Sequence, residues 1–156
     1  MSRHESILRK RIYALTSLMI VGLVISGVTA IPLKTEMDLL ARTINIPEGS
    51  WLAKIREAIR SVDAEYPFLF YGTDWLAFGH IVIAVAFVGA LRHPTRNRWL
   101  FDFGLIACVM VIPYALVMGA VRGIPLWWRL IDCSFGIIGA IPMLLCRRYA
   151  RELESR

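Results

Sequence analysis

The chain has 156 residues, 57% of them hydrophobic, and a formal net charge of +6 at pH 7. Its mean hydropathy of +0.58 is typical of a polytopic membrane protein and argues against a soluble one. The basic residues lie at the ends of apolar runs, so we expect them to contact membrane lipids and set orientation, and we expect no nucleic acid as a partner.

Four apolar runs predict four membrane spans, because each is close to the roughly 20 residues that cross a hydrocarbon core about 30 Å thick. The runs cover residues 12–33, 73–91, 99–121 and 126–146. A connecting segment, 34–72, separates the first two spans, and a tail, 147–156, follows the last. No room remains for a separate globular domain. The predicted fold is all-α, a four-transmembrane-helix bundle that forms a single membrane domain over residues 1–156.

The charge distribution predicts the orientation of the bundle. Basic residues precede the first span, separate the second from the third and follow the fourth: Arg3, Arg9, Lys10, Arg11; Arg92, Arg96, Arg98; Arg147, Arg148, Arg151, Arg156. By the positive-inside rule these three segments are cytoplasmic. The segment 34–72 balances basic with acidic residues and is predicted to be extracytoplasmic. Both termini are therefore expected in the cytoplasm, and the compactness of the chain favours a bacterial cytoplasmic membrane.

The first span admits two interpretations. The basic triplet 9–11, the apolar run and the small residues 28–30 also fit a cleaved signal peptide. We favour a retained helix, because the run continues to Leu33 and retention gives an even number of spans. Gly22, Ser26 and Ala30 recur every four residues and predict the face that contacts a neighbouring helix, and Pro32 is expected to end or kink the helix.

The connecting segment 34–72 contains two predicted helices. Ser50 is a plausible N-cap before apolar residues at helical spacing from Trp51 to Val62, with charged residues on the other side. This pattern predicts an interfacial amphipathic helix, lying flat on the outer leaflet or as a lid across the bundle. A shorter helix is predicted from about Thr35 to Ile44, and residues 45–49 break the two.

The spans also contain ionisable side chains, which predict the candidate site. Arg129 and Asp132 lie in the fourth run and His80 in the second. Such residues are costly in lipid and are functional candidates by default. At about 1.5 Å per residue, His80 lies about 8 Å below Trp75, and Asp132 lies about 8 Å below Trp127. Because the second and fourth spans run in the same direction, we expect His80 and Asp132 to converge.

The predicted site is a polar pocket in the outer half of the bundle. Arg129 would contact an anion, while Asp132 and His80 would form hydrogen bonds or handle a proton. Tyr114 and Trp128 would form its walls. No motif assigns a catalytic residue, so His80 and Asp132 are only candidates for that role.

Helical spacing also predicts which residues share a face of the fourth span. That face carries Arg129, Asp132, Cys133, Gly136, Ala140 and Met143. Arg129 and Asp132 are one turn apart, so they could instead pair with each other. In that alternative the polar groups support helix packing and bind nothing. Asp102, near the cytoplasmic end of the third span, is expected to form a boundary ion pair with Arg98, Arg92 or Arg147.

No cofactor or metal is expected. A bis-histidine haem needs two facing imidazoles, whereas only His80 of the three histidines lies within a span. The chain has no zinc-binding or CxxC spacing and no glycine-rich nucleotide loop. Cys108, Cys133 and Cys146 lie at different depths, so we expect reduced thiols.

These observations favour a small polytopic membrane protein that binds an anionic amphiphile, a lipid or a partner subunit. One alternative is a membrane enzyme that acts on a lipid or isoprenoid substrate with the same residues. Others are an accessory or assembly subunit of a larger membrane complex and a proton-coupled transporter. A homo-oligomer is compatible with each of them, and the sequence names no ligand.

Overall fold

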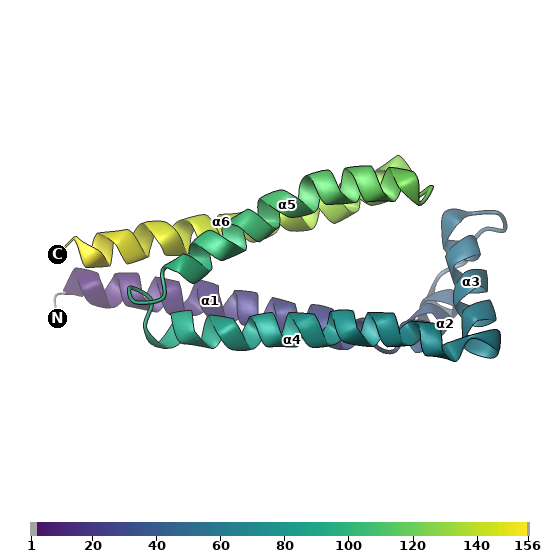
Figure 1. Cartoon of the computed structure of the whole chain (residues 1–156), viewed down its shortest axis with the longest axis horizontal. Coiled ribbons are helices and arrows are strands. Elements are labelled where there is room, and N and C mark those ends of the chain that lie inside the picture. Colours follow the sequence, from purple (N-terminus) through teal and green to yellow (C-terminus); the bar gives the residue numbers. More distant parts are fainter. Residues whose placement is uncertain (1–2, 156) are drawn as a thin grey trace. The chain divides into compact units, whose positions relative to one another are not determined.

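The computed structural model describes residues 3–155, and their secondary structure is entirely helical. Arg156, one of the basic residues of the predicted tail, lies outside these residues. The elements are shown in Figure 1. In chain order they are α1 (Arg3–Thr29), α2 (Leu33–Thr43), α3 (Trp51–Glu65), the 3-10 helix η1 (Pro67–Phe70), α4 (Tyr71–Arg92), α5 (Trp99–Val121) and α6 (Leu126–Glu154).

Four of these helical segments are long and apolar enough to cross a membrane: α1, η1 with α4, α5 and α6. They overlap all four predicted spans and indicate a small membrane protein, but α1 ends at Thr29, four residues before the predicted end of the first span at Leu33. Other helix ends extend beyond the apolar runs. The first helix begins at Arg3 rather than Ile12, and α6 continues through the predicted tail to Glu154.

The chain divides into two compact units. The first contains Met1–Val21 and Ala84–Arg156, and the second contains Gly22–Ile83. The long helices α1 and α4 each contribute residues to both units, so each unit is described separately below.

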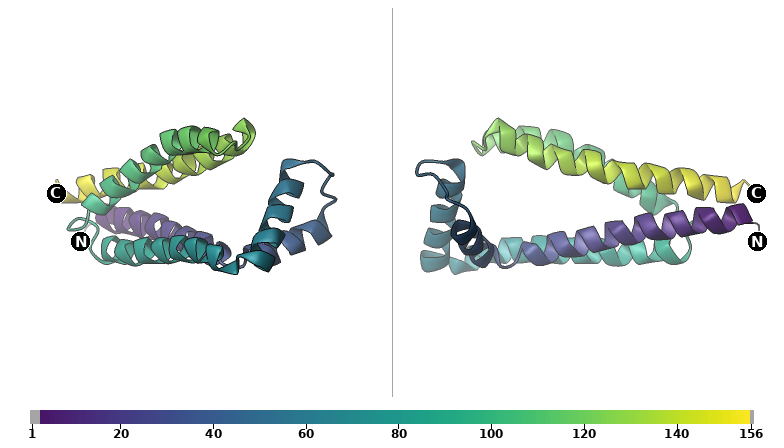
Figure 2. Two further views of the ribbon diagram at one scale, coloured as in Figure 1. Left: turned by 45° about the vertical axis from the view of Figure 1, so that its right-hand side comes forward. Right: turned by 180° about the vertical axis from the view of Figure 1, so that it is seen from behind.

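In the first unit, α5 and α6 lie side by side along their lengths (Figures 1 and 2). Glycines allow this close approach. A Cβ atom added to Gly136 would lie 2.5 Å from the carbonyl oxygen of Cys108, and one added to Gly104 would lie 2.7 Å from Sδ of Met143. Real Cβ atoms do not come so close, so a residue larger than glycine at position 136 would displace the α5 backbone, and one at position 104 would displace the Met143 side chain. Dispersion contacts between such closely packed backbones are a main source of helix association in lipid.

The buried core of the first unit includes residues from four helices. Its buried side chains are Leu8, Ile12 and Thr16 of α1, Ala84, Phe87 and Ala90 of α4, Leu100 and Phe101 of α5, and Cys133, Met143, Cys146 and Ala150 of α6. Thr16 is fully buried, and its hydroxyl lies 3.8 Å from Sγ of Cys146, a weak hydrogen bond between α1 and α6 in which either group could donate. The three cysteines are free thiols in this structure.

Ion pairs join the helices at the end of the first unit where both chain ends lie (Figure 1). Asp102 pairs with Arg147, one of the three partners predicted for it. Arg98 pairs with Glu154, and His4 lies 2.6 Å from a carboxylate oxygen of Glu152. Within the first unit, these ion pairs therefore lie at the end that the sequence predicts to be cytoplasmic.

In the second unit, α1 contacts α4 through Gly27. An added Cβ at Gly27 would lie 2.9 Å from the carbonyl oxygen of Ala77 and 3.1 Å from Cβ of His80. The predicted contact face of Gly22, Ser26 and Ala30 is wrong, since Gly22 and Ser26 are exposed and nothing lies within 4 Å of a Cβ at Gly22. Gly22, Ser26 and Ala30 do share one face of α1, but the contact with α4 is made by Gly27 on the adjacent face.

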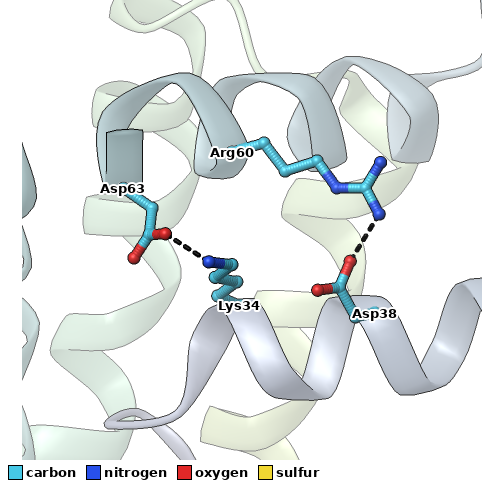
Figure 3. Close-up of polar contacts among 4 residues, drawn as sticks. All are labelled: Lys34, Asp38, Arg60 and Asp63. Carbon is cyan, nitrogen blue, oxygen red and sulfur yellow. Dashed lines mark hydrogen bonds and ion pairs between the residues drawn. The ribbon is translucent and has the colours of Figure 1, made fainter. Parts of the chain in front are cut away.

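The helices α2 and α3 form an antiparallel hairpin. Two ion pairs join them side by side, from Lys34 to Asp63 and from Arg60 to Asp38, the latter at 2.6 Å (Figure 3). The predicted N-cap is confirmed, because the Ser50 hydroxyl accepts a hydrogen bond from the Ala53 amide at 3.2 Å. Residues 44–50 break the helices as predicted, and Pro32 precedes α2 after α1 has ended.

Close packing of α5 on α6 predicts a large effect of one methyl group. Gly136→Ala places its Cβ against the Cys108 backbone carbonyl, which cannot move without moving α5. We expect about 1–3 kcal/mol of destabilisation, seen as a lower melting temperature in detergent. Gly22→Ala is the control, because its Cβ meets nothing and alanine favours helix. Equal melting temperatures for the two variants would contradict the described packing.

The ion pairs of the α2–α3 hairpin predict a pH dependence. The hydrogen bond to Asp63 raises the pKa of Lys34, and the hydrogen bond from Arg60 lowers the pKa of Asp38. Asp38 therefore stabilises the hairpin above its ordinary pKa of about 3.9 and loses this effect as pH falls further. Lys34 contributes below its ordinary pKa of about 10.4 and loses its effect as pH rises through its raised value.

We accordingly expect amide hydrogen exchange in α2 and α3, corrected for the intrinsic pH effect, to be slowest between these two limits. At pH 7, Lys34→Asp should accelerate exchange, and adding Asp63→Lys should restore protection because it re-forms the pair with reversed charges. A double variant that exchanges as fast as the single one would show that this pair does not hold the hairpin.

Candidate functional site

Arg129 is held at one end of the α5–α6 pair. Its aliphatic stem lies over Gly119, where an added Cβ would be 2.4 Å from Cδ of Arg129. Its Nη1 donates a hydrogen bond to the Leu116 carbonyl at 3.1 Å. Because α5 ends at Val121, the guanidinium lies near the C-terminal end of α5, where the helix dipole favours positive charge.

The guanidinium of Arg129 retains unused hydrogen-bonding capacity. Its Nε is buried and has no hydrogen-bond partner among residues 3–155. Arginine carries five N–H donors, and the Leu116 carbonyl receives one of the described bonds. No carboxylate of the described chain forms an ion pair with Arg129, so this half-buried cation lacks an anionic partner.

The described residues do not form the ion pair between Arg129 and Asp132 that the alternative expected, although Arg129 does support helix packing, as that alternative also expected. The two side chains are one turn apart on α6, but the arginine extends across to α5 and bonds its backbone. The space above Gly119, here called the Gly119 notch, explains why Arg129 extends toward α5. It gives the aliphatic stem of the arginine a packing surface that the stem would lose if Arg129 paired with Asp132 along α6. Asp132 is half-buried and has no hydrogen-bond or ion-pair partner in the part of the chain that the structure describes.

The predicted polar-to-small face of α6 is the face that contacts α5. Cys133, Gly136 and Met143 are buried. The Cys133 thiol lies 3.8 Å from the Ile112 carbonyl, and Gly136 and Met143 contact α5 as described above. Helical phase thus correctly grouped Arg129 with residues of α6 that contact α5.

His80 belongs to the second unit, where its ring is oriented by its own helix. Nδ1 lies 2.8 Å from the Leu76 carbonyl, and the Cβ of His80 packs against Gly27. A carbonyl only accepts hydrogen bonds, so Nδ1 carries the proton, and in the neutral ring Nε2 is left as an acceptor. Arg129 and Asp132 belong to the first unit, and the convergence of His80 with Asp132 stays a prediction.

The predicted walls of the site differ in exposure. Tyr114 projects from α5 with 69% of its surface exposed, whereas Trp128 is half-buried. The Trp128 ring packs edge-to-face on Trp127, with centroids 5.4 Å apart. Tyr114 therefore lies on the outer surface of the α5–α6 pair, and Trp128 lies one residue before the arginine.

Sequence reasoning missed Gly119 and Leu116, the residues that hold Arg129. A signal was available in the short connection at residues 122–125, because a tight antiparallel hairpin pairs positions equally distant from its turn. Gly119 lies two residues before the end of α5 and Arg129 three residues after the start of α6, so they nearly match this rule. A glycine opposite a long basic side chain predicts a notch for its stem.

Two surface hollows lie in the second unit. One, of about 250 Å³, is lined by Tyr71, Asp74, Trp75 and Phe78. The other, of about 370 Å³, is lined by residues of the α2–α3 region, among them Glu48, Arg56 and Arg60. Neither includes Arg129, Asp132 or His80.

Two further searches gave negative results. Among residues 3–155, no group of three or more His, Cys, Asp or Glu side chains is arranged to hold a metal ion. Comparison with known proteins finds no match to this chain among protein-family models, curated proteins or solved structures.

The geometry of His80 predicts one tautomer. Neutral His80 should carry its proton on Nδ1, because the Leu76 carbonyl accepts from that atom. The ¹⁵N chemical shifts of the protein in bilayers, compared with those of His80→Asn to assign the signals, measure this directly. An Nε2–H tautomer for His80 would overturn the described orientation of the ring.

Proposed function

We propose that this protein binds an amphiphile with an anionic headgroup, and that Arg129 is the anion contact. The proposal is carried by the way in which the Arg129 side chain is held and by its N–H donors that lack an acceptor. Its stem and one N–H are fixed on α5, while other donors of the guanidinium lack an acceptor in the described chain. The arginine is therefore preorganised before any ligand arrives, and binding need not restrict a freely rotating side chain.

Energetics favour an anion as the missing partner. A buried polar donor without an acceptor costs about 1–3 kcal/mol, and more when the group is charged. A phosphate or carboxylate could accept two parallel N–H bonds from a guanidinium, an arrangement that arginine forms better than lysine. Such a headgroup would satisfy both the charge and the open donors of Arg129.

The surrounding sequence supports the sign of the ligand. Between Phe103 and Leu144 the charged side chains are Arg122, Arg129 and Asp132, so this end of the α5–α6 pair has a net positive charge. Trp127 and Trp128 immediately precede the arginine, and tryptophan is enriched where membrane meets water. A lipid headgroup at that level would meet Arg129 while its acyl chains follow the apolar surface of the helices.

Asp132 is assigned a second role at the same ligand. It is one turn further along α6 and has no partner within the described residues. We assign it to a hydroxyl group of the headgroup, whose O–H would donate a hydrogen bond to the Asp132 carboxylate. The participation of His80 and Tyr114 in this site, and an enzymatic or transport role, stay predictions.

Retention of an added lipid tests the proposal. Purified protein is incubated with phosphatidylglycerol, and bound lipid is counted by native mass spectrometry. We expect Arg129→Ala to weaken retention about tenfold, since a hydrogen bond to a charged group contributes roughly 1.5–3 kcal/mol. Gly119→Ala should give a smaller loss, because it displaces the arginine without removing its charge.

Arg148→Ala is the matched control. Arg148 is an exposed arginine of the same helix with no described partner, so its loss changes net charge equally. Equal losses in Arg129→Ala and Arg148→Ala would reduce the effect to general surface charge and refute the site. A stoichiometric second subunit in the spectra, with no lipid, would instead favour the accessory-subunit alternative.

A further inference from the structure

The hollow at the start of α4 has a lining that the proposed anion site does not use. It is formed by three aromatic rings and one carboxylate: Tyr71, Trp75, Phe78 and Asp74. These positions follow i, i+3, i+4, i+7 spacing, so they form one continuous strip along α4. All four belong to the second unit.

The rings stand at right angles to one another rather than in a stack. Tyr71 and Trp75 have centroids 5.9 Å apart and an interplanar angle of 82°, and Trp75 and Phe78 have centroids 5.6 Å apart at 89°. The three rings are 55–62% exposed, so ring surface stays accessible along the strip. An open ring face carries negative charge density and attracts a cation.

The carboxylate of Asp74 supplies a full negative charge at the same place. The side chain is exposed and has no hydrogen-bond or ion-pair partner in residues 3–155. The nearest bonds on this part of α4 are made by others, such as Thr73, whose hydroxyl donates to the Phe70 carbonyl at 2.7 Å. Asp74 is therefore available to a ligand.

We propose that this hollow binds a quaternary ammonium group. Three aromatic walls and one unpaired carboxylate complement a cation that is bulky and has no N–H to donate. A primary ammonium is a strongly hydrated point charge and would give up bound water to contact the rings, whereas the methyl groups of a quaternary ammonium pack directly on them. The volume of about 250 Å³ accommodates the group whether it is the headgroup of a choline lipid or part of a free solute.

The site is independent of the proposed function. It uses none of Arg129, Asp132 or His80 and takes a ligand group of opposite charge. Both sites could be occupied by different molecules, and either could exist without the other.

Saturation-transfer NMR tests the site with tetramethylammonium and the full-length protein in a non-ionic, choline-free detergent. Neutral tert-butanol, which has a similar shape, separates charge recognition from apolar contact. We expect saturation of tetramethylammonium that exceeds that of tert-butanol at least several-fold. Equal signals for both probes, or none for either, would overturn the proposal.

Variants locate the binding. Trp75→Leu and Asp74→Asn should each weaken tetramethylammonium binding about fivefold, since an exposed cation–π contact or ion pair contributes up to about 1 kcal/mol. Trp127→Leu and Glu65→Gln remove an aromatic ring and an acid elsewhere and should leave binding unchanged. If the two control variants weakened binding as much as the first two, the assignment to this hollow would be wrong.

A competition experiment identifies the source of the cation. Short-chain phosphatidylcholine should displace tetramethylammonium, and phosphatidylglycerol of equal chain length should not, if the group is carried by a lipid. Displacement by free choline but not by phosphatidylcholine assigns it to a solute. Displacement by phosphatidylglycerol would show an apolar surface without charge recognition and would contradict the site.

Discussion

The contact between α5 and α6 determines what the rest of the first unit can do. Gly104, Gly119 and Gly136 bring the two helices close enough that side chains of one reach backbone carbonyls of the other. In lipid no water competes for those carbonyls, so an interhelical bond to them is satisfied only by protein. Arg129 uses this geometry. Its stem fills the Gly119 notch, and its guanidinium bonds Leu116 instead of the nearby Asp132.

Some charged side chains of the protein form ion pairs, and others have no ionic partner among the described residues. At the end of the first unit where the chain termini lie, Asp102, Arg147, Arg98 and Glu154 pair with one another. The hairpin α2–α3 is likewise joined by paired charges (Figure 3). Arg129, Asp132 and Asp74, in contrast, have no ionic partner in the described residues. Paired groups stabilise the fold, whereas these three groups leave charge available for a ligand, which is why both proposed sites contain them.

Sequence reasoning predicted the elements well because their signals are local. Apolar length revealed the four spans, Ser50 marked the start of α3, and helical phase identified the face of α6 that meets α5. Contacts between helices were harder to predict. The small-residue repeat favoured Gly22, but Gly27 makes the contact, because which of two glycines faces a neighbour depends on that neighbour's position. The register of the α5–α6 hairpin could have indicated the Gly119 notch, but the Leu116 carbonyl that bonds Arg129 carries no sequence signal of its own. The matched depths of His80 and Asp132 give their height along the helices and not their direction around them, so their convergence stays a prediction.

The most direct test of this account is the partner of the Arg129 guanidinium in a lipid bilayer. Solid-state NMR of protein labelled with ¹⁵N in arginine side chains and ¹³C in leucine carbonyls and aspartate side-chain carboxyls measures the dipolar couplings of Arg129 Nη1 to the Leu116 and Asp132 carbons, with Arg129→Lys to assign the signal. The account predicts a short-range coupling, because the nitrogen lies 3.1 Å from that carbonyl oxygen. No coupling to Leu116, together with a strong one to the side-chain carboxyl carbon of Asp132, would mean that the two charges neutralise each other and that no cation is left for an anionic headgroup.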